Sequence, residues 1–151
     1  MDTEHFLRPK LLERAMNKTV GLAARLGLVP RYVYLLEVRG RKTGKVYSTP
    51  VNLLAFKGRH YLVGPRGHSA WSKNAAAGGQ VTLVRGNSTQ QYRVIELPDD
   101  QKPEILRAYV NEYRHTVQRF FAVPGTSPVE AFRAIADRHP VFEVVIAGLP
   151  S

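Results

Sequence analysis

A chain of 151 residues with 44% hydrophobic and 23% charged side chains has the size and composition of a globular protein. It contains no apolar run near the roughly 20 residues of a membrane span, Asp2 and Glu4 stand where a signal peptide would be positive, and the absence of cysteine excludes disulfides and thiolate nucleophiles. The formal net charge of +10 points to an anionic ligand or partner, and the expected location is the cytoplasm.

No repeat or linker divides the sequence, so we expect one domain over residues 1–151, with a helix in 1–27, a core in 30–97 and a helical end in 98–151. Residues 9–27 predict the helix, with Gly27 as its C-cap. Its apolar stripe consists of Leu11, Leu12, Ala15, Met16, Val20, Ala23 and Leu26. Lysines and arginines along one edge of the stripe suggest a weak, peripheral contact with acidic membranes; docking of the stripe onto the core is the alternative.

The middle of the chain predicts strands. Runs of alternating or β-branched residues, separated by glycine turns, mark residues 31–38, 46–56, 60–63, 80–85 and 90–97, and an apolar run marks a last strand at 141–147. Between the third and fourth strands, Ser69 can cap a short helix that ends at Gly78 and Gly79.

The last third predicts two helices. One starts at Asp99 or Asp100 and runs to about Gln118; the other covers 128–138, because Ser127 to Glu130 matches a capping box with proline at the first helical position. The predicted fold class is α+β and mainly β: a small barrel of about six strands with an N-terminal helix and flanking helices.

Common catalytic motifs are missing. The sequence has no phosphate-binding P-loop, no G-x-G-x-x-G and no G-x-S-x-G, and its five histidines do not stand at metal-ligand spacing, so we predict no metal site. A chain without its own chemical apparatus, yet rich in positive charge, suggests that an anionic cofactor supplies the chemistry.

The positive charge is concentrated in the first part of the chain. Residues 1–86 carry 15 basic and 4 acidic side chains, and the remainder carries 7 and 8. Within that part, Gly40-Arg41-Lys42-Thr43-Gly44-Lys45 forms a basic turn, followed by Ser48, Thr49 and Pro50. Guanidinium, ammonium and backbone N–H donors in one turn suit a phosphate or carboxylate; a merely solvated turn is the alternative.

A second segment follows a strand and opens a helix. It runs from Gly64 through Arg66 and Gly67 to Trp71, Asn74 and Ala75. Free N–H groups at a helix start attract anions. Trp71 and Asn74 are three residues apart, so they share a helix face where an indole and an amide could meet a polar ring. Packing of Trp71 in the core is the alternative.

Together, the two segments resemble the nitroreductase-type deazaflavin-dependent oxidoreductases, which use coenzyme F-420 on a split β-barrel related to FMN-binding folds. The resemblance rests on the order G-R-K-[ST]-G-x-x-x-[ST]-P, at residues 40–50, then a glycine-containing loop, W-x-x-N at Trp71 and Asn74, and a strand with Val81 to Leu83. The sequence departs from many relatives at Pro65 to His68, where these have a small hydroxyl residue followed by paired glycines.

The resemblance implies hydride transfer from reduced F-420 to an electron-poor acceptor such as a quinone, an enone or a nitroaromatic compound. It implies that Arg41 and Lys42 bind the phosphate and oligoglutamate tail. The remaining implied cofactor contacts are Thr43, Gly44, Ser48, Thr49, Pro50, Arg66, Gly67, Trp71, Asn74 and Ala75. Tyr113 is our candidate for a catalytic hydroxyl near the acceptor.

Two other functions would also explain the charge. An FMN-binding split-barrel flavoprotein would need similar phosphate contacts. A non-catalytic nucleic-acid-binding barrel would explain the pI of about 10.2, but such proteins interleave aromatic and basic residues on an exposed sheet, and here much of the charge lies in turns. We expect no nucleic-acid partner, and the sequence leaves the oligomeric state open.

Overall fold

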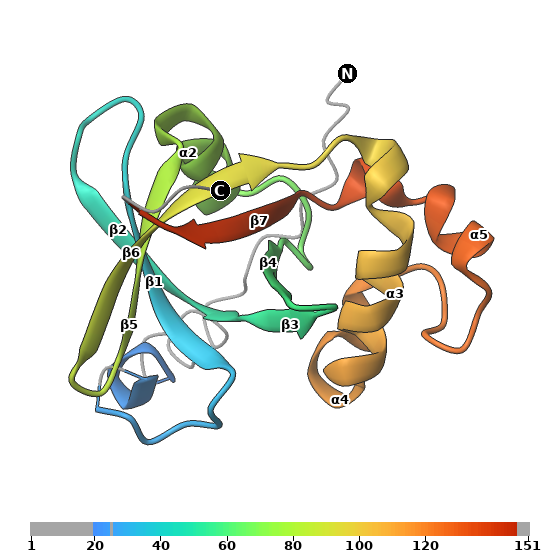
Figure 1. Cartoon of the computed structure of the whole chain (residues 1–151), viewed down its shortest axis with the longest axis horizontal. Helices are drawn as coiled ribbons and strands as arrows, with labels where there is room; N and C mark the ends of the chain where they lie inside the picture. The colour runs from blue at the N-terminus through green and yellow to red at the C-terminus, as the bar shows by residue number, and fades with distance from the viewer. Residues whose placement is uncertain (1–19, 25, 148–151) are drawn as a thin grey trace.

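The computed structural model describes residues 20–24 and 26–147, and its centre is one antiparallel sheet of seven strands (Figure 1). The spatial order of the strands is β2-β1-β5-β6-β7-β4-β3. Their bounds are β1 Val33–Arg39, β2 Val46–Asn52, β3 Leu54–Phe56, β4 Arg59–Val63, β5 Gln80–Arg85, β6 Ser88–Glu96 and β7 Val141–Ile146. The mainly β class and the split-barrel architecture predicted from the sequence are confirmed.

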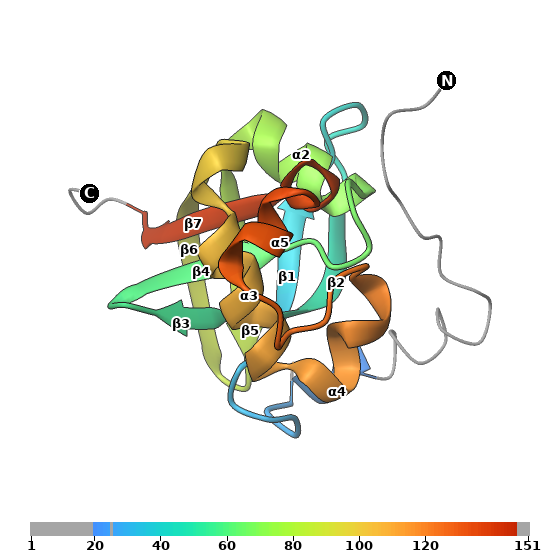
Figure 2. The same cartoon turned by 90° about the vertical axis from the view of Figure 1, so that its right-hand side faces the viewer.

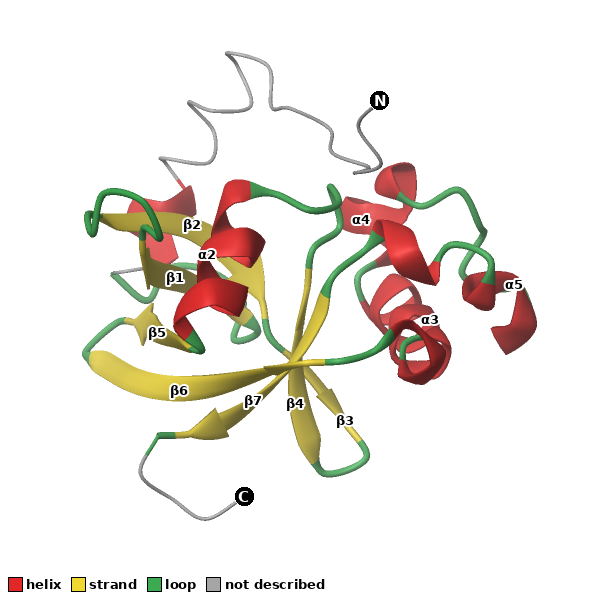
Figure 3. Ribbon diagram, turned by 90° about the horizontal axis from the view of Figure 1, so that it is seen from above, coloured by secondary structure: helices red, strands yellow, loops and turns green. Residues whose placement is uncertain are grey.

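The sheet must curl because its two edge strands are neighbours in the chain. Only Leu53 separates β2 from β3, yet these strands stand at opposite ends of the strand order. The result is the half-barrel seen from above in Figure 3. Pro50 lies in β2, which is an edge strand of the sheet. An edge strand tolerates proline, which has no N–H to donate.

The sequence predicted one strand over 46–56, and this prediction is wrong at Leu53. Its N–H donates to the carbonyl oxygen of Tyr32 over 2.8 Å, and its carbonyl oxygen accepts a hydrogen bond from the Tyr113 hydroxyl over 3.0 Å. Both backbone groups are therefore satisfied outside a strand ladder, and the chain turns there from one edge of the sheet to the other.

Helices cover two parts of the half-barrel. Their bounds are α2 Ala70–Gly78, α3 Pro103–Glu112, α4 Arg114–Val117 and α5 Val129–Arg133, with short 3₁₀ turns η1 Asp99–Gln101, η2 Gln118–Phe120 and η3 Ala136–Arg138. Figure 3 shows α3, α4 and α5 grouped on one side, apart from α2, and in Figure 2 these three helices lie in front of the sheet. The short helix predicted after Ser69 is confirmed, and Gly79 ends it in the left-handed conformation with φ 71°.

Two helix predictions are corrected. The helix expected from residue 99 to about 118 breaks at Tyr113, whose φ of −116° and ψ of 33° are not helical; at this position the Tyr113 hydroxyl donates to the carbonyl oxygen of Leu53, a tertiary contact that no local pattern contains. The predicted capping box at Ser127 does not form: Pro128 occupies the N-cap position, and the Glu130 carboxylate pairs with Arg133 at 3.2 Å instead. The helix predicted over 128–138 is therefore only α5, followed by η3.

The core consists of two main clusters of buried side chains. One fills the half-barrel beneath α2 and contains Leu36, Leu62, Leu83 and Phe142; the other joins α3 and α5 to β4 and β7. Burying one such leucine or phenylalanine stabilises the fold by roughly 1.5–3 kcal/mol. The second cluster attaches the C-terminal third of the chain to the sheet.

Most of the predicted N-terminal helix, residues 9–19, lies outside the described residues. Residues 20–24 are helical, and Gly27 has the left-handed conformation expected of a C-cap, with φ 75°. Gly21 and Ala24 are buried here, and Ala24 packs with Leu35 and Val84, whereas Leu26 is exposed. The predicted apolar stripe is therefore wrong at Leu26. No helix in residues 20–24 or 26–147 is both long and apolar enough to cross a membrane.

Candidate functional site

The basic turn between β1 and β2 is a tightly hydrogen-bonded structure. Gly40 donates to the carbonyl oxygen of Lys45 over 2.7 Å and accepts from the N–H of Gly44 over 3.0 Å. Lys45 donates its N–H to Thr43 Oγ1 over 3.2 Å. A side chain at Gly40 would place its Cβ 2.7 Å from the ring of Tyr47, so this ring would have to shift to admit one. The N–H groups of residues 40, 44 and 45 are thus engaged within the turn and not directed at a ligand.

A buried amide fixes Arg41 in this turn. The Oδ1 atom of Asn74 accepts the backbone N–H of Arg41 at 3.1 Å and its guanidinium Nη1 at 2.7 Å. Asn74 lies in α2 and is only 5% exposed. The sequence assigned Asn74 to a cofactor ring, but the acceptor side of its amide holds Arg41 at the mouth of the pocket described next.

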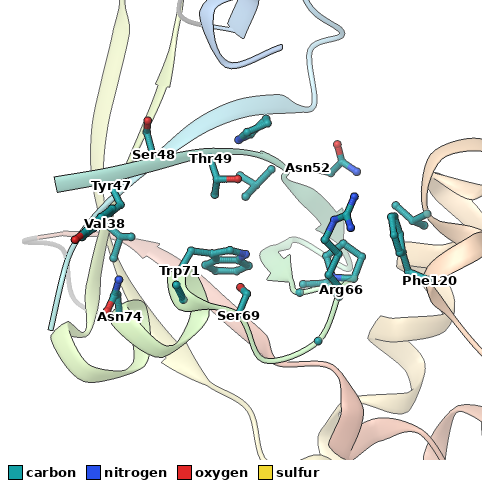
Figure 4. A pocket seen from close by; sticks show the side chains of 18 of the residues that line it. Val38, Tyr47, Ser48, Thr49, Asn52, Arg66, Ser69, Trp71, Asn74 and Phe120 are labelled. Carbon is teal, nitrogen blue, oxygen red and sulfur yellow. The ribbon is translucent and has the colours of Figure 1, made fainter. Parts of the chain in front are cut away.

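A pocket of about 900 Å³ runs from this turn along β2 to α4 and η2. Figure 4 shows Val38, Tyr47 and Asn74 at one end, Trp71 and Thr49 in the middle, and Arg66, Asn52 and Phe120 at the other. A volume of this size is that of a small-molecule or cofactor site. The two segments singled out in the sequence therefore line one continuous cavity.

Most of the site residues predicted from the sequence lie on the wall of this pocket. They are Arg41, Lys42, Thr43, Ser48, Thr49, Pro50, Arg66, Gly67, Trp71 and Asn74. Trp71 is half-buried, and its ring also packs against Phe142 with centroids 5.9 Å apart, so it belongs both to the pocket and to the edge of the core.

Three predicted residues do not line the pocket within the described part of the chain. Gly44 shapes the basic turn with φ 74°, and its carbonyl oxygen accepts a hydrogen bond from Arg39 over 2.8 Å. Ala75 is fully buried in the core. Tyr113 is 6% exposed, and its hydroxyl is occupied by the carbonyl oxygen of Leu53.

The charge of the pocket wall has one sign. Arg41 and Lys42 lie toward one end and Arg66 and Arg119 toward the other, and no acidic side chain is among the described residues on the wall. The two arginines at the far end each place the guanidinium carbon 4.5 Å from the centroid of the Phe120 ring. A wall of this kind favours a ligand with negative charge and an extended π system.

Sequence reasoning missed several wall residues that carry polar or aromatic groups. These are Tyr32, Tyr47, Asn52, Ser69, Tyr109, Arg119 and Phe120. Ser69 was read only as a helix cap; it is the N-cap of α2 and forms a capping box with Ser72, but its buried hydroxyl proton has no acceptor among the described residues, and Figure 4 places it beside Trp71. Tyr109 lies on the apolar side of α3 and packs in the core, as well as lining the pocket. No local motif marks these residues, because they reach the pocket only through the curl of the sheet.

Two tyrosines at the far end have strongly shifted acidity. Burial raises the pKa of Tyr109 well above its ordinary value, and burial, with the nearby Glu112 charge, raises the pKa of Tyr113 to about 12. Tyr109 accepts a hydrogen bond from Asn52 Nδ2 over 3.4 Å, so its own proton is not used in that contact. Tyr109 is therefore protonated at neutral pH; it is one of the wall residues, although its side chain is only 1% exposed and also belongs to the core.

Metal ligands do not gather anywhere in the described chain: no group of three histidine or acidic side chains lies close enough to hold an ion. The chemistry of this site is instead that of a basic, partly aromatic cavity. Such a cavity can bind and orient an anionic ring system, but it offers no nucleophile paired with a base.

Comparison with known proteins gives a consistent result. Residues 10–122 match the model of the family described as F-420H(2)-dependent quinone reductase. A solved F-420-H2 dependent reductase (FDR-A) aligns with a TM-score of 0.53 and 22% identity, over 78% of this chain and 96% of the other. A structure described as a domain-swapped dimer aligns with a TM-score of 0.54 and 21% identity, over 89% and 93%.

A FAD-binding protein from Mesorhizobium loti is also similar, with a TM-score of 0.50 and 17% identity, over 88% of this chain and 87% of that protein. At these identities the structural likeness establishes the fold. No curated protein matches the chain in sequence.

Proposed function

The chain belongs to the F-420H(2)-dependent quinone reductase family, and we propose that its pocket of about 900 Å³ is where the reduced cofactor and the acceptor meet. As a family member it is an oxidoreductase that passes a hydride from reduced F-420 to an electron-poor acceptor of the quinone type. The observation that carries the assignment to this pocket is its wall, which combines basic side chains from both ends with Trp71 and no acid among the described residues.

The residues present fit an anionic deazaflavin. The pocket has the volume for a tricyclic ring. The buried Ser69 Oγ faces the backbone N–H of Ser72 in the capping box of α2, but its own proton has no acceptor within the described part of the protein. A buried hydroxyl donor without an acceptor costs about 1–3 kcal/mol, and a ring carbonyl or phosphate oxygen beside it would remove that cost. The bound deazaflavin supplies two-electron chemistry, because its reduced ring delivers a hydride to the acceptor.

At the tail end, Arg41 and Lys42 would hold the phosphate and the glutamates. Asn74 occupies only one guanidinium nitrogen of Arg41, and a guanidinium carries five N–H donors, so bidentate contact with an anion is still available. Because the N–H groups of residues 40, 44 and 45 are engaged within the turn, they add nothing to this contact, and the side-chain charges of Arg41 and Lys42 would supply most of the affinity.

At the ring end, Trp71 would lie against the deazaflavin, with Ser69 donating to one of its oxygens. Both residues come from the start of α2, which begins without any acidic residue in its first turn. A helix start of this kind favours a ligand with partial negative charge. The half-buried indole also limits the entry of water to this part of the pocket.

The acceptor would enter beside Asn52, Tyr109 and Phe120. The Tyr109 hydroxyl remains protonated far above neutral pH and can donate a hydrogen bond to a quinone oxygen as negative charge develops there. This assigns to Tyr109 the role that the sequence suggested for Tyr113, whose hydroxyl is bound to Leu53.

The test is anaerobic oxidation of reduced F-420 by menadione with and without the protein. We expect catalysed recovery of the oxidised deazaflavin absorbance, with saturation in both substrates. The variant Tyr109→Phe should lower kcat while leaving F-420 binding unchanged. The control variant Arg133→Ala, at an exposed residue of α5, should behave as the parent. A rate equal to that without protein would contradict the proposal.

A further inference from the structure

The loop that carries Arg66 and Gly67 is held by a segment at the other end of the chain. This loop, residues 64–68, follows β4, and the segment, residues 137–140, precedes β7. The two strands pair antiparallel with Val63 opposite Val141, so the end of one strand and the start of the other emerge at the same place. Both loop residues lie on the pocket wall.

The first anchor is at Gly64. Its N–H donates to the carbonyl oxygen of Pro140 over 2.9 Å, and its carbonyl oxygen accepts from Nδ1 of His139 over 3.0 Å. A Cβ at this position would lie 2.7 Å from the Pro140 ring, so the segment packs directly on the glycine. The His139 ring is itself fixed, being 1% exposed and stacked on Phe121 at 4.1 Å between centroids.

The second anchor is at His68, at the other end of the loop. Its Nε2 atom lies 2.8 Å from the carbonyl oxygen of Asp137. Because a carbonyl oxygen can only accept, the proton of this hydrogen bond must be on Nε2, and by the same reasoning Nδ1 of His139 is protonated. Gly67 closes the loop internally by donating to the carbonyl oxygen of Gly64 over 3.1 Å.

The hydrogen bond from Gly67 to Gly64 closes a tight turn within the loop, but it does not fix the orientation of this turn relative to the pocket. The two anchors do, because they fix both ends of the loop to one segment. Between them, Arg66 lies over the ring of Phe120 at 4.5 Å.

We infer that residues 137–140 are a positioning device for the pocket, acting through His68 and His139. The expected effect on F-420 binding rests on the proposed function. The inference concerns a part of the chain beyond residues 10–122, which match the family model.

The experiment compares a variant that removes each N–H donor with one that keeps it. His68→Leu removes the donor, while His68→Gln retains one near the Nε2 position; His139→Leu and His139→Asn form the second pair, with Asn retaining a donor near Nδ1. His60→Leu is the control, because His60 is an exposed histidine of β4 away from this loop. Amide hydrogen exchange is measured on the protein without cofactor, and F-420 affinity is measured separately.

We expect His68→Leu to speed exchange in residues 64–69 by about two- to tenfold, the effect of one ordinary hydrogen bond, with no change in β5 and β6. F-420 affinity should fall by a similar factor, and both effects should be reversed in His68→Gln. If His139→Leu fails to fold, the His68 pair alone decides. Unchanged exchange, faster exchange with unchanged F-420 affinity, or absence of rescue would each overturn the inference. If the parent protein does not bind F-420, the proposed function is wrong. The exchange measurement still tests whether residues 137–140 hold the loop.

Discussion

At the scale of single residues, the pocket depends on polar groups whose partners lie far away in the sequence. Asn74 holds Arg41 across 33 positions, and Tyr113 holds the carbonyl of Leu53 across 60. Arg85 is a third case: its guanidinium binds the carbonyl oxygens of Pro30 and Val33 over 2.9 and 3.1 Å. Part of the positive charge in residues 1–86 is therefore structural, and only the remainder is available to an anion.

The contact between Asn74 and Arg41 predicts a coupled effect on cofactor binding. Asn74→Ala should weaken F-420 binding by about two- to tenfold, because the guanidinium and the backbone N–H of Arg41 each lose their hydrogen bond to Asn74 Oδ1. In an Arg41→Ala background, the same substitution should have a much smaller further effect, because only the backbone bond is left to lose. The measurement is a double-mutant cycle by F-420 titration, with folding checked by circular dichroism. If the loss in the double variant equals the sum of the losses in the two single variants, Asn74 acts independently of Arg41.

The buried tyrosines predict a loss of stability in strong alkali. The ordinary pKa of Tyr113 is 10.0, and burial raises its pKa in the folded protein to about 12. Above pH 10 the unfolded chain releases this proton more readily than the folded one, so folding becomes less favourable as pH rises from 10 to 12. The free energy of unfolding should therefore fall less steeply with pH in Tyr113→Phe than in the parent, as measured by urea denaturation. Equal slopes in the two proteins would contradict this.

At the scale of elements, sequence patterns located most elements, and the errors occurred where tertiary contacts decide. The β5–β6 hairpin and α2 were predicted because turn glycines and periodicity are local signals. The break at Leu53, by contrast, depends on Tyr32 and Tyr113, and no pattern within residues 46–56 contains that information. The capping box at Ser127 matched a motif, but an ion pair between Glu130 and Arg133 replaced it.

The place of α2 predicts a spectroscopic signal. Trp71 is the only tryptophan in the chain and lies on the pocket wall. Binding of F-420 should therefore quench its fluorescence in a saturable manner, with the same midpoint as an independent binding measurement. Binding that leaves the tryptophan emission unchanged would place the cofactor ring away from α2 and assign Trp71 to the core with Phe142.

At the scale of the whole molecule, the curl of one sheet brings the two sequence motifs together. The basic turn lies between β1 and β2, and the second motif opens α2. Residues of both motifs line the same pocket (Figure 4). Motif order allowed the cofactor class to be predicted. The far end of the pocket could not be predicted, because Tyr109, Arg119 and Phe120 come from helices placed by the hydrophobic core and not by a motif.

The most direct test of the central claim is a titration of the protein with F-420 and, separately, with FMN. We expect F-420 to bind more tightly, since its tail reaches the basic turn. Arg41→Ala and Lys42→Ala should each weaken F-420 binding about tenfold or more, as expected for charge-assisted hydrogen bonds of roughly 1.5–3 kcal/mol. The effect should shrink as salt rises. Arg133→Ala is the matched control. Equal affinity for F-420 in all four proteins, or tighter binding of FMN than of F-420, would contradict the account.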